Sequence, residues 1–400
     1  MSVLSEGSTS GVDSLFSVLA DRQTQMSAMA QSALSSGADL YVKGRYDEAA
    51  RAFQRSIGLD PSEENVIKAS DLLATVYIKQ NKITEAVKAY KTSISRAPTD
   101  DSAHAKLGNI YFGQGRYNEA ENEYKAAVNL NPTSSTNIYS LGQVHLAKGR
   151  YREAEARFKQ VIQMAPQHYG GYYALGQTYG KEGRTKEAIE LFKKVNAMQK
   201  DFNQVRVDLG SAYADRGELD KANEQLEILY EKDAKLYVIL YNYIDKATKP
   251  KFLAATSDNG FISGLGPGTP LTYLSSALAD PNASKTFHMT FIFSKEMDAS
   301  SVMNPVNWRI SKATSNPPSG AYNWGVPRST SDAKVSSLPS NIIYLEDSLT
   351  ATISFTVRQN ETADAAIDPS HIVFKFSGMD AYGNAMDLSA DEYSGFSTFA

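Results

Sequence analysis

Small and large apolar residues recur along the first part of the chain with a period close to 34 residues. One position holds a small residue, and the position three residues later is mostly aromatic; these are Gly37, Ala74, Gly108, Gly142, Gly176 and Gly210, then Leu40, Tyr77, Tyr111, His145, Tyr179 and Tyr213. A second position is always alanine, and a large apolar residue follows four residues later; these are Ala49, Ala86, Ala120, Ala154, Ala188 and Ala222, then Phe53, Tyr90, Tyr124, Phe158, Phe192 and Leu226. Spacings of three and four residues place side chains on one face of a helix. A period of this length predicts one pair of helices per unit.

A short motif marks the junction inside most units. KGRYDEA at 43–49 returns as QGRYNEA at 114–120, KGRYREA at 148–154 and EGRTKEA at 182–188. Glycine at the end of a first helix provides the left-handed residue that often ends helices, and the glutamate after it suits the first turn of a second helix. The motif therefore predicts a helix–turn–helix elbow, with its arginines mostly solvated. The second unit has Asn81 in place of the glycine, and asparagine also tolerates this conformation.

These repeated positions resemble the tetratricopeptide repeat (TPR) family, in six units over roughly residues 30–234. The resemblance implies an all-α solenoid in which the small residue lets two helices approach closely. It also implies that the first helix of each unit faces a concave groove. Residues 235–247, KLYVILYNYIDKA, are expected to form a solvating cap helix, which gives a solenoid domain over 30–249.

Residues 1–29 combine a Ser/Gly-rich tail with an amphipathic pattern. Val12, Leu15, Phe16, Leu19 and Met26 fall near helical spacing. Two interpretations remain open: an extra helix packed against the first repeat, or a docking helix for another subunit.

The pattern changes after Pro250, where charged residues thin out and prolines become frequent. Short alternating segments predict antiparallel strands separated by turns. We expect strands over 286–293, 307–311, 341–347, 350–357, 372–378 and 396–399. FSKEMDASSVMNPVNWRI at 293–310 and SGMDAYGNAMD at 377–387 resemble the Ig-like domains of bacterial surface-layer and adhesion-type proteins. The resemblance implies an all-β Ig-like sandwich over 250–400, so the fold class is multidomain. Asp380 and Asp387 leave open a calcium site, but their spacing is not that of a dedicated loop.

Composition excludes several classes of protein. The chain has no cysteine and a formal net charge of −4, so neither thiolate chemistry nor a basic field for nucleic acid is expected. No apolar run is long enough for a membrane span. The first residues lack the basic region of a signal peptide. The expected location is the cytoplasm, with the cell surface by a non-classical export route as the alternative.

The sequence contains no recognisable catalytic motif. Its five histidines, His104, His145, His168, His288 and His371, show no metal-ligand spacing. The GxSxG, phosphate-loop and dinucleotide patterns are absent as well. We therefore expect a protein without enzymatic activity, metal or cofactor.

The candidate binding residues come from the repeat register. One position on the first helices holds Asn109, Gln143 and Gln177, and the position four residues earlier holds Tyr139 and Tyr173. Amides can satisfy the backbone of an extended peptide, and tyrosines offer large contact area.

The expected function is non-catalytic. The chain would act as an interaction or scaffold protein that binds a partner peptide in the solenoid groove and docks through its Ig-like domain. The alternative is a structural subunit of a bacterial surface or extracellular assembly, a filament or layer, held by the N-terminal segment and the Ig-like domain. A homo-oligomer would then form through residues 1–29 or the Ig-like domain.

Overall fold

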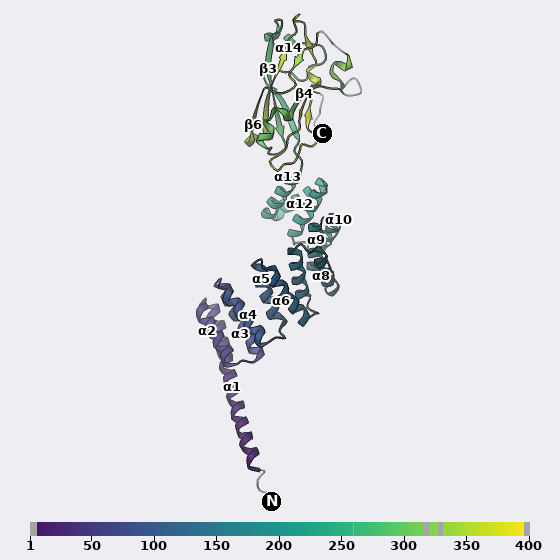
Figure 1. Ribbon diagram of the computed structural model, residues 1–400. Coiled ribbons are helices and arrows are strands. Elements are labelled where there is room, and N and C mark those ends of the chain that lie inside the picture. The colour runs from purple at the N-terminus through teal and green to yellow at the C-terminus, as the bar shows by residue number, and fades with distance from the viewer. Residues whose placement is uncertain (1–5, 259, 315–319, 327–330, 396–400) are drawn as a thin grey trace. The chain divides into compact units, whose positions relative to one another are not determined.

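The computed structural model describes the chain except for residues 1–5, 259, 315–319, 327–330 and 396–400 (Figure 1). Contacts divide it into two compact units. The first comprises residues up to 216 together with 220–237, and the second comprises 217–219 and 238 onward. In the described part of the chain, no helix combines the length and apolar character needed to cross a membrane.

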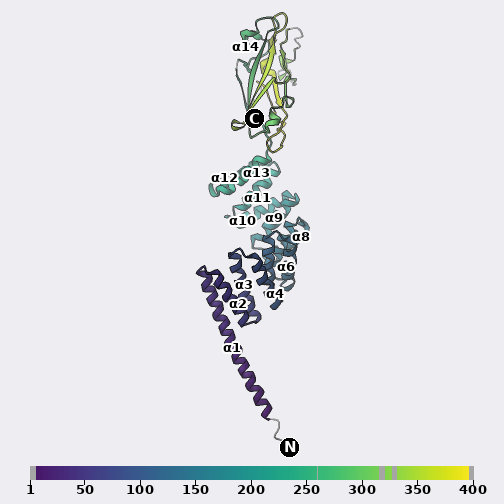
Figure 2. The ribbon, with the colours of Figure 1, turned by 60° about the vertical axis from the view of Figure 1, so that its left-hand side comes forward.

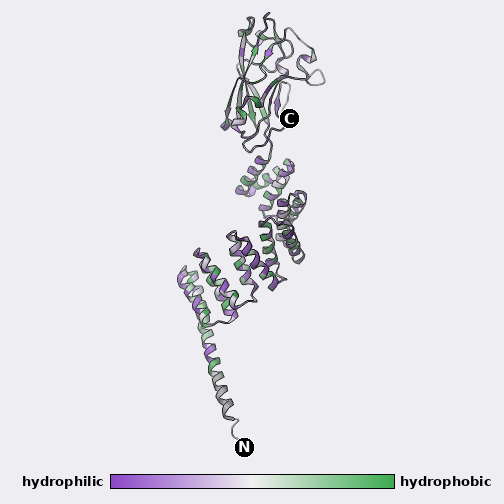
Figure 3. Cartoon of the chain, viewed as in Figure 1, coloured by the Kyte–Doolittle hydropathy of each residue, from purple (hydrophilic) through white to green (hydrophobic). Residues whose placement is uncertain are grey.

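The first unit is an array of antiparallel helix pairs (Figures 1 and 2). In chain order the helices are α1 (Glu6–Val42), α2 (Tyr46–Leu59), α3 (Glu63–Lys79), α4 (Ile83–Arg96), α5 (Asp101–Gly113), α6 (Tyr117–Leu130), α7 (Ser135–Ala147), α8 (Tyr151–Met164), α9 (Tyr169–Glu182), α10 (Thr185–Met198), α11 (Gln204–Asp215) and α12 (Leu219–Lys232). Apolar and polar residues alternate around these helices (Figure 3). The helical solenoid predicted from the 34-residue period is confirmed.

In four of the described pairs an aromatic ring of the second helix lies on a glycine of the first, at Gly37, Gly108, Gly142 and Gly176. A Cβ added to Gly142 would lie 2.6 Å from the Phe158 ring, and one added to Gly176 would lie 2.7 Å from Phe192. The alanine position is fully covered, as Ala154 shows with 0% exposure. The glycines are therefore required by close packing, as the sequence pattern predicts.

The elbows also follow the prediction, but their arginines do not. Gly149 and Gly183 have φ of 71° and 83°, and Asn81 has φ of 58°. The arginines after the glycines were expected to be mostly solvated, which is wrong for Arg150 and Arg184. These two side chains bond to glutamates of the preceding unit, as described below.

Buried Glu121 links the third and fourth units. The Nζ atoms of Lys148 and Lys125 lie 2.6 Å and 2.7 Å from its carboxylate oxygens, and the Arg150 guanidinium also bonds to this carboxylate. Burial raises the pKa of Glu121, but these three cationic donors outweigh burial and hold it at about 2. One unit further on, Arg184 bonds Glu155 at 2.8 Å. Ion pairs thus supplement apolar packing between neighbouring units.

Helix α1 is a single helix of 37 residues that includes the first helix of the first repeat. A separate helix packed against that repeat, one of the two interpretations of residues 1–29, does not form. Residues 16–25 of α1 are exposed, and the first buried residue after them is Ala30. The helix therefore extends well beyond α2, with which it pairs.

The second unit is rich in strands: β1 (Phe252–Asp258), β2 (Thr269–Pro270), β3 (Ser284–Phe293), β4 (Trp308–Lys312), β5 (Lys334–Val335), β6 (Asn341–Leu345), β7 (Thr350–Arg358), β8 (Ala366–Ile367), β9 (Ile372–Phe376) and β10 (Glu392–Tyr393). A five-stranded antiparallel sheet has the order β1-β3-β7-β5, with β6 also paired to β7. A three-stranded sheet has the order β10-β9-β4, and β2 pairs β8. Short helical turns at α14 (Leu271–Leu274) and α15 (Ala299–Val302) connect strands.

The two larger sheets share one aromatic core. Phe291 of β3 lies 5.2 Å from Trp308 of β4 and 5.7 Å from Phe374 of β9, measured between ring centroids. Five of the six expected strands form, and the sixth, 396–399, lies outside the described residues. Strand β1 was not expected, because its sequence FLAATSD alternates weakly.

Helix α13 (Ala234–Ala247) forms over the residues expected for a cap helix, and its residues from 238 onward group with the strands. The Nζ atom of buried Lys295 caps its C-terminal end by donating to the carbonyls of Asp245 and Thr248. The same ammonium lies 3.0 Å from the Asp380 carboxylate. The end of α13 is therefore fixed to the strand-rich unit.

Candidate functional site

A pocket of about 580 Å³ opens beside the first helices of the fourth and fifth repeats. Aromatic side chains dominate its lining, with Ser135 and Thr136 at its polar part. The ring-bearing residues are Tyr139, His168, Tyr169, Tyr173 and Phe202. The two tyrosines predicted from the sequence therefore lie in one pocket.

The rings support one another. Phe202 meets Tyr173 edge to face at 4.9 Å between centroids, and meets Tyr169 at 5.2 Å. Tyr169 in turn stacks on His168 at 5.2 Å with 13° between the ring planes. Edge-to-face and stacked contacts favour fixed ring positions. The pocket wall is therefore arranged before any ligand arrives.

Local sequence explains why the rings gather here. His168 is the N-cap of α9, where its Nδ1 accepts from the Gly170 amide at 3.1 Å. At the corresponding position two units earlier, Asp100 caps α5 through the Ser102 amide. In the sixth unit this position holds Phe202, which turns a capping position into a wall of the pocket. Gly171 lets α9 approach α8, because a Cβ there would lie 2.9 Å from Ile162.

A carboxylate lies behind the pocket wall. The Tyr173 hydroxyl donates to Asp208 Oδ2 at 2.6 Å. Burial raises the pKa of Asp208, although hydrogen bonds from Tyr173, Gln204 and Gln177 act in the opposite direction. Burial, followed by the neighbouring Asp208, raises the pKa of Tyr173 as well. The pair joins the fifth and sixth units across the groove.

The predicted amides have partners inside the chain. Asn109 is exposed, and its Oδ1 accepts from the Tyr124 hydroxyl at 2.5 Å. Gln143 hydrogen-bonds the hydroxyl of Tyr139, whose pKa burial nevertheless raises. Gln177 bonds Asp208. The three amides therefore orient neighbouring side chains, and their contact with a peptide backbone stays a prediction.

Sequence reasoning missed His168, Tyr169, Phe202 and Asp208. Only Phe202 left a signal, because the repeat register places it where other units carry a helix cap. Asp208 occupies the position of Lys106 in the third unit, and this position varies in charge from unit to unit. Its importance comes from the Tyr173 hydroxyl, which spacing along one helix does not reveal.

The carboxylates considered for calcium have other partners. Asp380 Oδ1 accepts the amides of Tyr382 and Asn384, and Asp380 Oδ2 lies beside Lys295. Asp387 Oδ1 accepts the amide and hydroxyl of Ser389. Within the described residues, no group of three or more histidine, aspartate or glutamate side chains is placed to hold a metal ion.

A serine, a histidine and an aspartate also meet in the core of the strand-rich unit. His371 Nδ1 lies 2.7 Å from Asp368, and the Ser370 hydroxyl donates to the same carboxylate at 2.7 Å. All three side chains are buried. A nucleophilic serine needs a histidine nitrogen as its base and access to substrate. The Ser370 hydroxyl also lies 3.1 Å from His371 Nδ1. Because all three side chains are closed off from solvent, the cluster suits a structural role.

Comparison with known proteins matches the helical part of the chain. The model of the cilia and flagella-associated protein 70 C-terminal domain, a TPR domain, matches residues 13–235, which is more than half of the chain. No curated protein matches.

Several solved structures resemble the same part. A tetratricopeptide repeat protein from Parabacteroides merdae is 17% identical, with 55% of this chain and 89% of that chain covered and a TM-score of 0.48. PilF of Pseudomonas aeruginosa is 17% identical, with 55% and 99% covered and a TM-score of 0.44. YrrB, described as a TPR protein with an unusual peptide-binding site, is 20% identical, with 48% and 99% covered and a TM-score of 0.41.

Proposed function

Because the chain belongs to the family of the cilia and flagella-associated protein 70 C-terminal domain, we propose that it binds a segment of a partner protein in the pocket around Tyr139 and Tyr173. Proteins of this repeat type mediate protein–protein interactions, and solenoids offer extended concave surfaces for them. The proposal is of a non-catalytic interaction protein.

The observation that carries the proposal is the group of five aromatic rings around one open pocket. Tyrosine is enriched at the centres of interfaces because it buries much area while losing little side-chain entropy. Tyr139 and Tyr173 are only half-buried, so both keep surface available to a partner. A large apolar side chain of the partner would fill the pocket between them.

The partner's charge follows from Asp208. Its raised pKa means that the hydrogen bonds from Tyr173, Gln204 and Gln177, together with the charge of Lys181, do not fully compensate for burial of the carboxylate. A cation brought close to a partly buried carboxylate stabilises its charged form. We therefore propose a segment that carries an aromatic or large aliphatic residue near a lysine or arginine.

For the strand-rich unit we propose a second docking role, with an Ig-like character. The support is the resemblance over 293–310 and 377–387 and the aromatic core shared by the two larger sheets. The rigid attachment of α13 through Lys295 gives this unit a fixed helical edge.

A selection from a random peptide library on the immobilised full chain tests the proposal. The Tyr139→Ala/Tyr173→Ala double variant serves for counter-selection. The proposal predicts enriched peptides that share one aromatic or large aliphatic residue close to a basic residue. Enrichment of acidic peptides, or of the same peptides on both proteins, would contradict it.

A further inference from the structure

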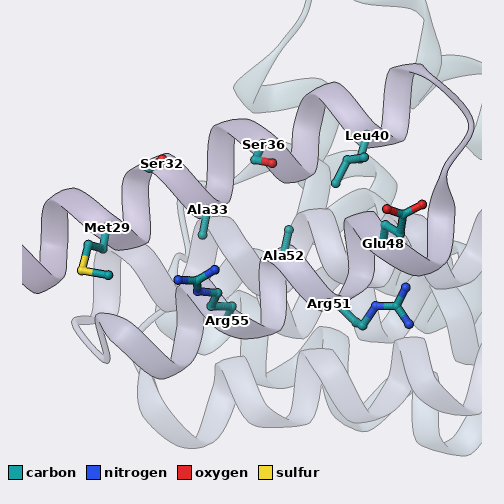
Figure 4. Close-up of a pocket in the computed structure, with 9 residues that line it drawn as sticks. All are labelled: Met29, Ser32, Ala33, Ser36, Leu40, Glu48, Arg51, Ala52 and Arg55. Atoms are coloured by element: carbon teal, nitrogen blue, oxygen red, sulfur yellow. The ribbon is translucent and has the colours of Figure 1, made fainter.

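The array begins with an open groove between α1 and α2, of about 470 Å³ (Figure 4). Met29, Ala33 and Leu40 line it from α1, and Ala52 and Arg55 line it from α2. Arg51 lies on the same side of α2 and adds a second positive charge. Ser32 and Ser36 of α1 and Glu48 of α2 complete the lining. The groove is thus partly apolar along α1, and along α2 it carries two arginines and one glutamate.

The second repeat has the equivalent groove, and there the neighbouring helix α2 lines one side of it. Residues 37 positions later than those of the first groove line this second one, with Ser70 for Ala33, Tyr77 for Leu40 and Ala89 for Ala52. Gln54 and Ile57 of α2 close its far side. A helix therefore fits against such a groove in this fold. Because α2 and α3 are consecutive helices of an up-and-down array, α2 runs antiparallel to α3, the first helix of this groove.

Within the described residues no helix packs on the first groove from the N-terminal side, while α1 extends past α2 with an exposed face. Leu19 and Met29 are 51% and 49% exposed. One apolar stripe runs along α1 and continues into the groove. Its members are separated by three, four or seven residues, which places them on one helix face; they are Leu19, Met26, Met29, Ala33 and Leu40. A short helical segment without tertiary contacts is marginally stable in water. A partner that covers this stripe would therefore stabilise the exposed part of α1.

We propose that two copies of the chain pair through α1, with the exposed end of each α1 lying antiparallel in the end groove of the other. A two-fold axis makes each patch meet its own copy, so the patch must be self-complementary. An axis near Thr24 places Leu19 of one copy against Met29 of the other. Residues 6–29 carry three acidic residues and one arginine, a net charge of −2, whereas Arg51, Arg55 and Glu48 give the groove a net charge of +1, so the net charges are complementary.

Sedimentation equilibrium of the full chain over a range of concentrations tests the pairing. The wild type should be a dimer that dissociates on dilution, and Leu19→Asp/Met26→Asp should be a monomer at every concentration. Val42→Asp is the control, since Val42 is 85% exposed on the opposite face of α1 and should leave the dimer intact. A monomeric wild type, or a dimeric double variant, would overturn the proposal. Circular dichroism should show that the double variant keeps its fold and its melting temperature, because the changed residues lie outside the repeat core.

Cross-linking tests the orientation independently. Because the native chain has no cysteine, only the introduced cysteines can form a disulfide. Leu19→Cys and Met29→Cys chains, mixed and oxidised, should form a disulfide between the two variants. Neither variant alone should do so efficiently, because like positions in an antiparallel pair lie farther apart than the ~7 Å that a disulfide spans between Cα atoms. Efficient cross-linking of each variant with itself would mean a parallel pair and would contradict the antiparallel arrangement.

Discussion

The hydroxyl of Tyr173 donates a 2.6 Å hydrogen bond to Asp208, which lies one repeat farther along the chain. The bond fixes a ring of the pocket against the following unit, so binding surface and solenoid packing depend on the same contact. The carboxylate is partly buried, and its pKa is raised.

Asp208→Asn should therefore change the pH dependence of stability. A carboxyl whose pKa is higher in the fold than its ordinary 3.8 binds more protons folded than unfolded, so its contribution to stability falls as pH rises through this range. The variant should gain stability relative to the wild type between pH 3 and pH 7. Urea titrations at both pH values measure this, and a relative loss at pH 7 would contradict the raised pKa.

Glu121→Gln should give the opposite dependence. The pKa of Glu121 is about 2, below its ordinary 4.5, so its stabilising contribution is fully present above pH 4.5 and is lost as pH falls toward 2. The variant should lose about 2–3 kcal/mol at pH 7 and almost nothing near pH 2. Glu190→Gln is the control, because the Glu190 side chain is 72% exposed and its pair with Lys193 should contribute little. Equal losses of stability in both variants would mean that the buried Glu121 network contributes no more than the exposed pair of Glu190 with Lys193.

Gly142→Ala and Gly180→Ala should have effects of opposite sign. A methyl group at Gly142 would lie 2.6 Å from Phe158, whereas none of the described atoms lies within 4 Å of a Cβ at Gly180. Overpacking costs about 1–3 kcal/mol, and alanine is favoured over glycine in a helix by up to about 1 kcal/mol. Thermal melts of both variants decide between these effects, and two stabilised proteins would refute the close packing of the repeat.

Much of the solenoid could be predicted because every repeat packs its two helices through the same sequence positions. The pairing of Gly142 with Phe158, and the left-handed Gly149, follow from positions within a single unit. The contact of Arg150 with Glu121 could not be predicted in this way, since it joins side chains of neighbouring units whose approach the spacing does not define. The amphipathic spacing of residues 12–26 indicated a helix, but this spacing does not define whether that helix stands alone or continues into the first helix of the repeat, as α1 does.

The candidate site was predicted in part. Tyr139 and Tyr173 share a repeat position, so their register placed them on one surface. Phe202 comes from a loop, and Asp208 acts through a neighbouring unit, so neither belongs to a repeated pattern. In the strand-rich unit, alternation located β3 and β7, but the pairing of β1 with β3 depends on long-range contacts that alternation does not specify.

The most direct test of the account measures the affinity of one selected peptide by fluorescence anisotropy. Tyr139→Ala/Tyr173→Ala should weaken binding more than tenfold, since central tyrosines of an interface often contribute about 2 kcal/mol or more. Tyr117→Ala is the matched control, because that tyrosine is 37% exposed at the start of α6, outside the pocket, and its loss should leave the affinity within about twofold. Melting temperatures of the variants separate lost binding from lost fold. An unchanged affinity in a folded double variant would contradict the proposed site.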